Sequence, residues 1–370
     1  MRASNVLGII YASAYDEHIS EMTSVRASGS IPFGGRYRLI DFPLSDMVDC
    51  GITAVGVSTK SNYRSLMDHL GSGKPWDLSR KNEGMTILPP FDLAGNGGAN
   101  RTRLEALQGL LNYISFSKKE YILLADANVV ANLNYEAIID GHIKSGADIT
   151  ICYKHGVKPN LPNIMTFTLD GEKITKVLVN ENDKAEKDYS LNILVLRKAL
   201  LERLVNAATA AGATDFERDV IAANVDTLFL RGEKIDDFAY TIDSLKTYYE
   251  VSMKLVQGGY KELFKKDLPI YTKVRDNMPA IYGIGSKAAN SLIADGCTIK
   301  GTVENSILFR GVYVAEGAVV RNSVVMQDSY ISENAKLNCA VLDKNVVIKP
   351  NKELSGADTC PLYIAKDSTV

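Results

Sequence analysis

Val6-Leu7-Gly8-Ile9-Ile10-Tyr11-Ala12 is a nearly continuous apolar run, and a loop from Ser13 to Gly29 follows it. Such a run is typical of a strand buried on both faces of a parallel sheet. In α/β folds the loop after this strand often binds nucleotide phosphates, and glycines let its backbone N–H groups approach them. Here the first half of the loop has no glycine and carries Asp16, Glu17 and Glu21. The stretch therefore predicts the frame of a nucleotide site without its phosphate-binding loop.

Strand and helix patterns alternate along the rest of the first 257 residues. The spacing of Thr102 and Glu105 predicts a capping box at the start of a helix, and Thr214 and Glu217 repeat that spacing. Apolar runs predict strands at 53–59, 85–88, 121–126 and 148–153, with helices at 62–70, 102–114 and 135–145 and a hairpin at 165–179. We therefore expect an α/β fold over residues 1–257, with a Rossmann-like, doubly wound and mostly parallel sheet.

The C-terminal part is a repeat with a period of 17 residues. Val303-Glu304-Asn305-Ser306-Ile307-Leu308 recurs as Val320-Arg321-Asn322-Ser323-Val324-Val325 and as Leu337-Asn338-Cys339-Ala340-Val341-Leu342. A looser copy begins at Asn290. A period near 18 residues corresponds to three hexapeptides per turn, which predicts a left-handed parallel β-helix. We expect four turns and a C-terminal tail within residues 281–370, preceded by a surface linker at 258–280.

The composition argues against several classes of protein. The 370 residues carry a formal net charge of −2, which gives no basic footprint for nucleic acid. No apolar run approaches the length of a membrane span. The five cysteines are scattered without CxxC spacing, so a disulfide framework or a zinc site is not expected. The residues before Val6 lack the shape of a signal peptide, and we expect a cytoplasmic protein.

Three stretches carry a family resemblance that extends over essentially the full chain. They are Pro32-Phe33-Gly34-Gly35-Arg36-Tyr37-Arg38-Leu39-Ile40-Asp41-Phe42-Pro43-Leu44-Ser45, Asp68-His69-Leu70-Gly71-Ser72-Gly73-Lys74-Pro75-Trp76-Asp77-Leu78, and Ile87-Leu88-Pro89-Pro90. Together with the β-helix repeat, they resemble the sugar-1-phosphate nucleotidyltransferases, in particular bacterial glucose-1-phosphate adenylyltransferase (ADP-glucose pyrophosphorylase). The resemblance implies a reaction of ATP with glucose-1-phosphate that gives ADP-glucose and pyrophosphate, with Mg²⁺ as cofactor.

The chain departs from the family pattern at the positions that carry catalysis, and no catalytic set is intact. Of the two family aspartates that bind the metal, Asp126 is retained, whereas Thr241 replaces the other. The resemblance therefore implies a degenerate metal site. Besides the glycine-rich signature, the family's Lys-Pro, Gly-Thr-Ala-Asp and Glu-Lys-Pro motifs are replaced by Ser28-Gly29, Arg101-Thr102-Arg103-Leu104 and residues around Val179-Asn180-Glu181-Asn182.

These losses predict a catalytically impaired chain. Nucleotidyl transfer depends on neutralising negative charge with Mg²⁺, lysines and backbone N–H groups, and one lost donor lowers the rate by roughly 10²–10³. The pattern resembles the GlgD-type regulatory subunit of ADP-glucose pyrophosphorylase. That resemblance implies a role in glycogen biosynthesis, a catalytic GlgC-type partner in a heterotetramer, Mg²⁺ in the assembled enzyme, and sugar-phosphate or nucleotide effectors. A homo-oligomer of this chain alone is the alternative assembly.

Several residues have a functional and a structural interpretation. Asp126 is either a remaining metal ligand or a carboxylate that caps the turn after its strand, and we favour the cap. Asp243 is a better N-cap for the next helix than a replacement metal ligand. Arg36 and Arg38 either bind an anionic effector or a partner subunit, or they are structural and pair with nearby aspartates.

Three further residues are candidates for the lining of a remnant pocket. They are Trp76, Lys74 and Arg101. For Trp76, ordinary packing explains the sequence equally well. For Arg101 and its neighbour Arg103, the simpler interpretation is a solvated helix start.

Three other functions are compatible with parts of the sequence. One is an active adenylyltransferase with a divergent phosphate loop, and another is a binding protein that senses sugar nucleotides. The third, a hexapeptide-repeat acyltransferase, generally needs a histidine base on the β-helix. All four histidines precede residue 156, which argues against that third function.

Overall fold

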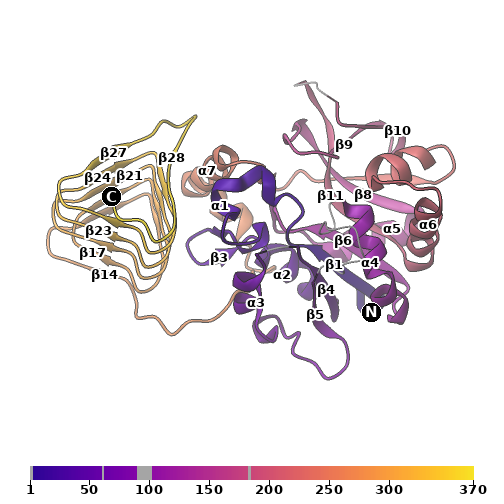
Figure 1. Ribbon diagram of the computed structural model, residues 1–370, viewed down its shortest axis with the longest axis horizontal. Coiled ribbons are helices and arrows are strands. Elements are labelled where there is room, and N and C mark those ends of the chain that lie inside the picture. The colour runs from indigo at the N-terminus through magenta and orange to yellow at the C-terminus, as the bar shows by residue number, and fades with distance from the viewer. Residues whose placement is uncertain (1–2, 61, 90–101, 182–184) are drawn as a thin grey trace.

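The computed structural model describes residues 3–60, 62–89, 102–181 and 185–370. An α/β domain and a β-helix lie side by side along the longest axis of the molecule, and the chain that joins them runs along its lower edge (Figure 1). Helix α1 (Ser20–Thr23) and helix α7 (Leu245–Lys254) lie on the side of the α/β domain that faces the β-helix. The predicted two-part architecture is confirmed.

A nine-stranded sheet forms the centre of the α/β domain. Its strands are β1 (Val6–Tyr11), β4 (Ala54–Ser58), β5 (Gly84–Leu88), β6 (Tyr121–Asp126), β8 (Ile149–Val157), β9 (Met165–Asp170), β10 (Lys173–Val179), β11 (Glu186–Arg197) and β12 (Leu230–Lys234). They follow the order β5-β4-β1-β6-β11-β8-β12-β10-β9. β1 is parallel to β4 and β6, whereas β11 is antiparallel to β6 and β8. Every residue of β1 is buried, as its apolar run predicts.

Helices cover both faces of this sheet, so the doubly wound prediction is confirmed. On one face pack α2 (Asp41–Asp49), α3 (Arg64–Leu70) and α5 (Tyr135–Ser145), through buried side chains such as Leu44 and Ile138. On the other pack α4 (Arg103–Phe116) and α6 (Lys198–Ala210), through Leu107 and Leu201. The capping box of α4 is confirmed, because the Glu105 N–H donates to Thr102 Oγ1 at 3.2 Å.

The second capping box, predicted at Thr214 and Glu217, is wrong. Asp215 Oδ1 accepts the N–H of Arg218 at 2.7 Å, so an aspartate one residue later caps this turn. Residues Glu217–Ile221 then form a short π-helical turn. The Glu217 side chain is 2% exposed, which leaves it available for a contact inside the protein.

The β-helix has five coils, one more than predicted. Its three parallel sheets consist of β14 (Ile281–Tyr282), β17 (Thr298–Ile299), β20 (Tyr313–Val314), β23 (Tyr330–Ile331) and β26 (Val347–Ile348); β15 (Lys287–Ala289), β18 (Thr302–Glu304), β21 (Val319–Arg321), β24 (Lys336–Asn338) and β27 (Glu353–Ser355); and β16 (Leu292–Ile293), β19 (Ile307–Leu308), β22 (Val324–Val325), β25 (Ala340–Leu342) and β28 (Leu362–Ile364). The prediction missed the last coil because extra residues separate β27 from β28: Leu342 pairs with Ile364, whereas Val325 pairs with Leu342.

Asparagines at the corners of the β-helix explain why the repeat is so regular. Asn305 and Asn322 have φ of 48° and 45°, a left-handed conformation that asparagine tolerates better than most residues. Their side chains also bond to each other, since Asn305 Nδ2 donates to Asn322 Oδ1 at 3.4 Å. The repeated Asn thus fixes both the corner and the stacking.

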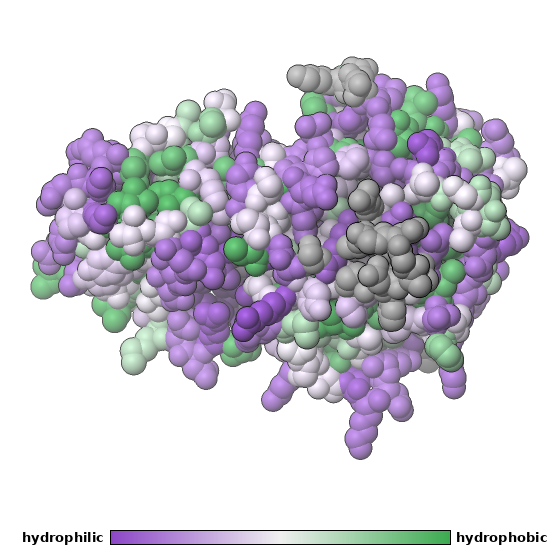
Figure 2. Space-filling model, viewed as in Figure 1, coloured by the Kyte–Doolittle hydropathy of each residue, from purple (hydrophilic) through white to green (hydrophobic). Residues whose placement is uncertain are grey.

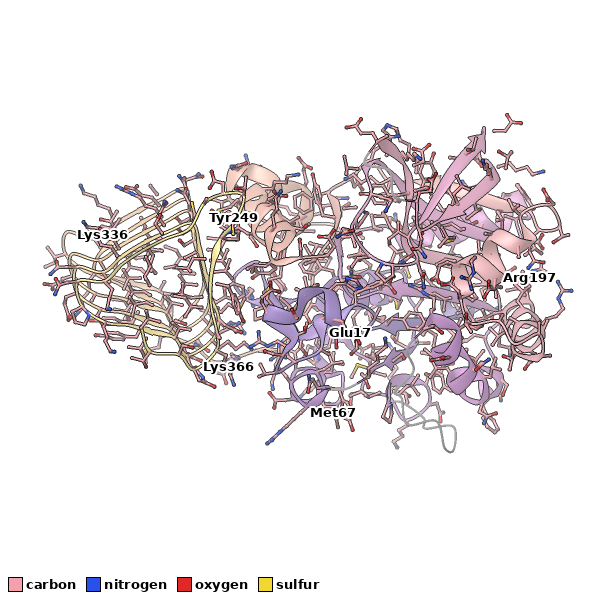
Figure 3. All side chains as sticks on the ribbon, turned by 45° about the horizontal axis from the view of Figure 1, so that its top comes forward. Glu17, Met67, Arg197, Tyr249, Lys336 and Lys366 are labelled. Atoms are coloured by element: carbon pink, nitrogen blue, oxygen red, sulfur yellow. The ribbon has the colours of Figure 1, made fainter. Side chains whose placement is uncertain are left out.

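The two domains share one hydrophobic cluster and a buried ion pair. Phe33 and Tyr248 of the α/β domain belong to the same cluster as Phe309 and Val324 of the β-helix. Tyr249 of α7 lies at the boundary (Figure 3) and its hydroxyl donates to the carbonyl oxygen of Asn322 at 2.7 Å. The domains are therefore packed through specific contacts and are not simply tethered.

The linker begins later than predicted. After α7 the helix continues through a π-helical turn (Leu255–Gly259) and α8 (Tyr260–Leu263). Gly258 has φ of 119° and kinks this helical stretch without ending it. Four short strands complete the α/β domain: β2 (Pro32–Phe33) pairs with β3 (Tyr37–Arg38), and β7 (Val129–Ala131) pairs with β13 (Ala239–Thr241).

Candidate functional site

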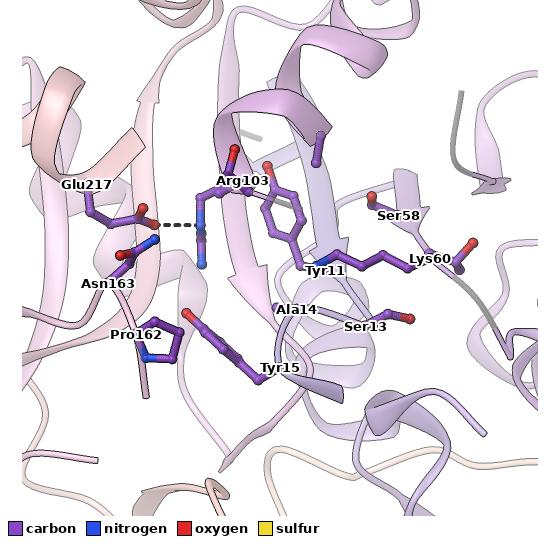
Figure 4. Close-up of a pocket in the computed structure, with 13 residues that line it drawn as sticks. Tyr11, Ser13, Ala14, Tyr15, Ser58, Lys60, Arg103, Pro162, Asn163 and Glu217 are labelled. Carbon is purple, nitrogen blue, oxygen red and sulfur yellow. Dashed lines mark ion pairs between the residues drawn. The ribbon is translucent and has the colours of Figure 1, made fainter. Parts of the chain in front are cut away.

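A small cavity lies at the carboxyl ends of β1 and β4, the edge at which α/β folds bind nucleotides. Its volume is about 80 Å³, whereas ligand pockets usually measure roughly 300–1,000 Å³. Figure 4 shows Arg103 between Glu217 and Tyr11. The lining residues are Tyr11, Ser13, Ala14, Tyr15, Ser58, Thr59, Lys60, Thr102, Arg103, Ala106, Pro162, Asn163 and Glu217. The cavity thus has the position of a nucleotide site but not its size.

The loop after β1 is folded onto itself by an acidic side chain. Asp16 Oδ1 accepts the backbone N–H of Ser28 at 2.8 Å, so a carboxylate of the chain holds an amide of this loop. Burial raises the pKa of Asp16, and the hydrogen bonds from Ser28 oppose that rise. Gly29 follows, packed so closely that a Cβ would lie 3.2 Å from Ala12 and from Ala127. This loop is built as a packed structure with negative charge, the opposite of a phosphate cradle.

Asp126, at the end of β6, binds an arginine. Arg103 Nη2 donates to both Asp126 oxygens at 2.7 Å. Asn192 Nδ2 also donates to Asp126 Oδ2, at 2.9 Å, from a bulge in β11 where Asn192 has φ of 56°. Burial raises the pKa of Asp126, and the Arg103 guanidinium opposes that rise. Asp126 is therefore neither the turn cap that we favoured nor a carboxylate open to a metal ion.

Glu217 completes this group from the other side of the arginine. Arg103 Nε lies 2.8 Å from Glu217 Oε1, and the Arg103 Cζ atom lies 4.7 Å from the centre of the Tyr11 ring. Burial raises the pKa of Glu217 to about 7, with Arg103 opposing the rise. The Asn192 amide also donates to the hydroxyl of Tyr15 at 2.8 Å, which ties the loop after β1 to the group.

The residues present do not fit a Mg²⁺ ion at Asp126. Mg²⁺ requires near-octahedral oxygen coordination, but both Asp126 oxygens already accept hydrogen bonds from a cation. Thr241 contributes a neutral hydroxyl, and Asp243 accepts the Asn160 N–H at 2.7 Å instead of facing Asp126. The N-cap of α7 is Ser244, one residue after the predicted Asp243. Among the residues that the structure describes, no cluster of three or more His, Cys, Asp or Glu side chains could hold a metal ion.

The predicted lining of the remnant pocket differs from the structure. Trp76 is 1% exposed and packs edge-on against His69, with ring centres 5.8 Å apart. Lys74 begins the same short 3₁₀ turn, Lys74–Trp76, on the exposed side. Neither residue lines the cavity at the strand ends, because the glycine-rich loop that carries them packs on α3. Arg101 lies outside the described residues.

Arg36 and Arg38 lie near the domain interface in different environments. Arg36 is exposed, with its guanidinium 5.8 Å from the Tyr37 ring centre. Arg38 is 7% exposed and donates to the carbonyl oxygen of Ser65 at 2.7 Å. Burial lowers the pKa of Arg38 to about 10, and the charge of Asp41 opposes this decrease. The structural interpretation through aspartate is correct only in part, because the Arg38 backbone N–H, not its side chain, bonds to Asp41 at 3.0 Å.

A surplus of positive charge surrounds Arg38 where the two domains meet. Arg26 Nη2 forms a buried ion pair with Asp343 Oδ1 of the β-helix at 2.8 Å. Lys344 follows Asp343, and burial together with Arg38, Arg26 and Arg275 lowers its pKa to about 7. No carboxylate of the described residues forms an ion pair with the Lys344 side chain. We call the group Arg26, Arg38, Arg275 and Lys344 the interface cation cluster.

Sequence reasoning missed three residues of the strand-end site. Arg103 was taken as a solvated residue, although it is 6% exposed. Glu217 was assigned to a cap, and Asn192 carried no signal except its tolerance of a positive φ. The charged pairs lie 23 or more residues apart in the chain, so no local pattern connects them.

The fold and this site together define a nucleotidyltransferase-type α/β domain joined to a hexapeptide-repeat β-helix. Residues 7–161 match the nucleotidyl transferase family, and residues 281–359 match the GlmU-like C-terminal hexapeptide family. Within the described residues, no helix is long and apolar enough to cross a membrane.

Relatives that match most of the chain narrow this class. The chain is 32% identical to the glycogen biosynthesis protein GlgD of Bacillus subtilis (strain 168), over 85% of this chain and 82% of that protein. GlgD of Geobacillus stearothermophilus is 34% identical, over 86% of this chain and 83% of that protein. A glucose-1-phosphate adenylyltransferase of Pseudothermotoga lettingae is 34% identical, over 85% of this chain and 76% of that protein. The chain therefore belongs to the family of bacterial glucose-1-phosphate adenylyltransferases and GlgD proteins.

Proposed function

We propose that this chain is a catalytically impaired, regulatory subunit of ADP-glucose pyrophosphorylase that acts in glycogen biosynthesis with a catalytic GlgC-type subunit. The observation that carries the proposal is the loop after β1, in which Asp16 holds the Ser28 N–H at 2.8 Å. An incoming triphosphate would have to displace a carboxylate from that amide and would meet further negative charge from Glu17. Loss of the phosphate contacts removes the electrostatic stabilisation on which nucleotidyl transfer depends.

The interface cation cluster supports a regulatory role. Its arginines and Lys344 exceed the carboxylates that pair with them, and surplus charge of one sign attracts a counter-ion. Because the cluster includes residues of both domains, an anion bound there would change the contact between them. We propose sugar-phosphate or nucleotide effectors for this position, with Arg38 and Lys344 as contacts. The exposed Arg36 is available to the effector or to a partner subunit.

The surface of the β-helix supports assembly with other subunits. Ile281, Tyr330 and Val347 are in register on one outer face and are 56%, 38% and 36% exposed. The space-filling view in Figure 2 also shows hydrophobic residues gathered over part of the β-helix. Contiguous exposed apolar surface marks protein–protein contacts. We propose that the β-helix contributes to a heterotetramer with GlgC-type subunits, which supply the Mg²⁺-dependent active site.

The test compares ADP-glucose synthesis by three samples: this chain alone, a GlgC-type subunit alone, and the two co-expressed. We expect the chain alone to be at least about 10³-fold slower than the assembly, since several donors worth roughly 10²–10³ each are missing. We also expect the assembly to respond to phosphorylated effectors differently from the GlgC-type subunit alone. Rapid synthesis by the chain alone would instead establish an active enzyme with a divergent phosphate loop.

Calorimetry on the chain alone examines the remaining alternative, a sensor of sugar nucleotides. Titration with ATP, ADP-glucose and glucose-1-phosphate should show no binding that depends on the strand-end cavity. A change of Ala106 in the cavity wall to Leu is a suitable probe, because it narrows the cavity without touching the charged group. Tight binding of ADP-glucose that this substitution removes would contradict the proposal.

A further inference from the structure

Arg103, Asp126 and Glu217 form a deeply buried charge group in the α/β domain. Their side chains are 6%, 1% and 2% exposed. They come from α4, from the end of β6 and from the π-helical turn after α6. Two buried carboxylates are costly unless a cation compensates them. The fold of this edge therefore requires a positive charge between Asp126 and Glu217.

We propose that the Arg103 guanidinium is the permanent cation of this edge, and that removing it uncovers a latent divalent-cation site formed by Asp126 and Glu217. Arg103 Nη2 holds both oxygens of Asp126 at 2.7 Å, and Nε lies 2.8 Å from Glu217 Oε1. Neighbouring nitrogens of one small planar group make these contacts, so the two carboxylates lie close enough to share one ion. This inference concerns the chain by itself and does not depend on its role as a subunit.

The Arg103 guanidinium supplies one positive charge to a group with two carboxylates. It contacts Glu217 through Oε1 alone. The second oxygen of Glu217, Oε2, is buried and has no hydrogen-bond partner in the described parts of the chain. A divalent ion in place of the guanidinium would keep both acids ionised and would provide a partner for that oxygen.

The surroundings also fit a planar guanidinium better than a hydrated metal ion. The Tyr11 ring, 4.7 Å from Arg103 Cζ, offers an aromatic face, which attracts a guanidinium. Asn192 approaches Asp126 with its amide Nδ2, a donor and not a ligand oxygen. Removing Arg103 leaves space for an ion with its water molecules while the two carboxylates remain.

The experiment uses Mn²⁺ alone as the probe and the full-length chain. Four proteins are compared: the wild type, Arg103→Ala, Arg103→Ala combined with Asp126→Asn, and Arg197→Ala as the matched control. Arg197 is exposed, lies far from the β-helix (Figure 3) and contacts the Tyr121 ring at 5.9 Å. Electron paramagnetic resonance counts bound Mn²⁺, and thermal melting is recorded in EDTA and in about 1 mM Mn²⁺, since a ligand that binds only the folded state raises the melting temperature.

We expect Arg103→Ala to bind about one Mn²⁺ per chain at least tenfold more tightly than the wild type, and to melt higher in Mn²⁺ than in EDTA. The added Asp126→Asn change should remove both effects, and Arg197→Ala should behave as the wild type. If Arg103→Ala folds only when Mn²⁺ is present, that result also supports the proposal. Arg103→Gln, which retains hydrogen-bond donors but no charge, serves as the second variant, and the same Mn²⁺ response is expected.

Two results would overturn the proposal. In the first, the wild type binds Mn²⁺ stoichiometrically and Asp126→Asn removes that binding, which would show that Arg103 leaves the metal site open. In the second, a folded Arg103→Ala or Arg103→Gln protein gains no Mn²⁺ binding. The first measurement needs no Arg103 variant, and neither one relies on catalysis, so both are independent of the subunit assay.

Discussion

The strand-end site and the domain interface are both rich in charge, but they use it differently. At the strand ends, Arg103 lies between Asp126 and Glu217, and the loop amide of Ser28 is bound by Asp16. At the interface, Arg38 donates to a neutral carbonyl, and burial among other cations lowers the pKa of Lys344. In the first region an arginine lies between acids of the same chain, whereas the second region retains a surplus of positive charge.

This difference separates structure from ligand binding within one chain. An internal ion pair competes with any ligand for the same charges, as Arg103 does at Asp126 and Glu217. A surplus of partly buried cations costs stability, and a bound anion would offset that cost. The comparison teaches that two charged regions of one fold can differ in whether the chain itself supplies the counter-charge.

The largest expected effect comes from the buried ion pair between Arg26 of the α/β domain and Asp343 of the β-helix. Arg26→Met leaves Asp343 buried without its partner, and we expect the free energy of unfolding to fall by about 3–5 kcal/mol. Urea unfolding followed by tryptophan fluorescence measures this change. Arg321→Ala is the control, because its pair with Glu304 also spans 2.8 Å but is 55% and 38% exposed, and such pairs contribute about 0–1 kcal/mol. Equal losses in the two variants would show that burial is not what matters at the junction.

A smaller, pH-dependent effect is expected from Lys344→Met. The folded-state pKa is lowered from 10.5 to about 7, so keeping this lysine charged in the folded protein costs stability below pH 7, and the cost disappears as the pH rises toward 10. The variant should be more stable than the wild type by on the order of 2 kcal/mol at pH 6 and by less at pH 9. Unfolding curves across this pH range measure the difference.

Inorganic phosphate provides a further check on the interface cation cluster. It should stabilise the wild type near neutral pH more than it stabilises Lys344→Met, because an anion offsets the surplus charge. Arg321→Ala, at an exposed position outside the interface cation cluster, is the control and should retain the response of the wild type to phosphate in this chain alone. If the difference in unfolding free energy between the wild type and Lys344→Met does not change with pH, that result would contradict the assigned titration of Lys344.

The smallest effect is expected at the strand ends, from Glu217→Gln. The pKa of Glu217 is raised from 4.5 to about 7 in the folded state, so its contribution to stability is fully present below pH 4.5 and is lost as the pH rises through 7. Glu217→Gln should remove roughly 1 kcal/mol of this pH dependence between pH 5 and 8. Thermal melting of both proteins over that range tests the prediction, and parallel pH profiles would show that Glu217 does not titrate there.

Much of the architecture could be predicted because its signals are local. The apolar run of β1, the capping box at Thr102 and the 17-residue repeat each lie within a short stretch, where neighbours in sequence are neighbours in space. The missed fifth coil shows the limit of such signals. An insertion before β28 breaks the period, although Leu342 still pairs with Ile364.

The candidate site was predictable only as a set of losses. The missing glycines after β1 and the change to Thr241 are visible in single positions, and they predict that the family's site is altered. What replaced it was not visible, since Trp76 proved to be a core residue and Arg103 proved to be buried. Burial decides whether an arginine is solvated or pairs with acids, and burial is a property of the folded chain.

The sequence by itself determined the two domains, the β-helix repeat and the lack of glycine in the first half of the loop after β1, because each depends on residues that are close together in the chain. Only the tertiary structure decided the pairing of Arg103 with Asp126 and Glu217, and of Arg26 with Asp343, 317 residues apart. Coulombic attraction depends on distance in space and on the exclusion of water. Both quantities exist only after the sheet, its helices and the β-helix have packed together.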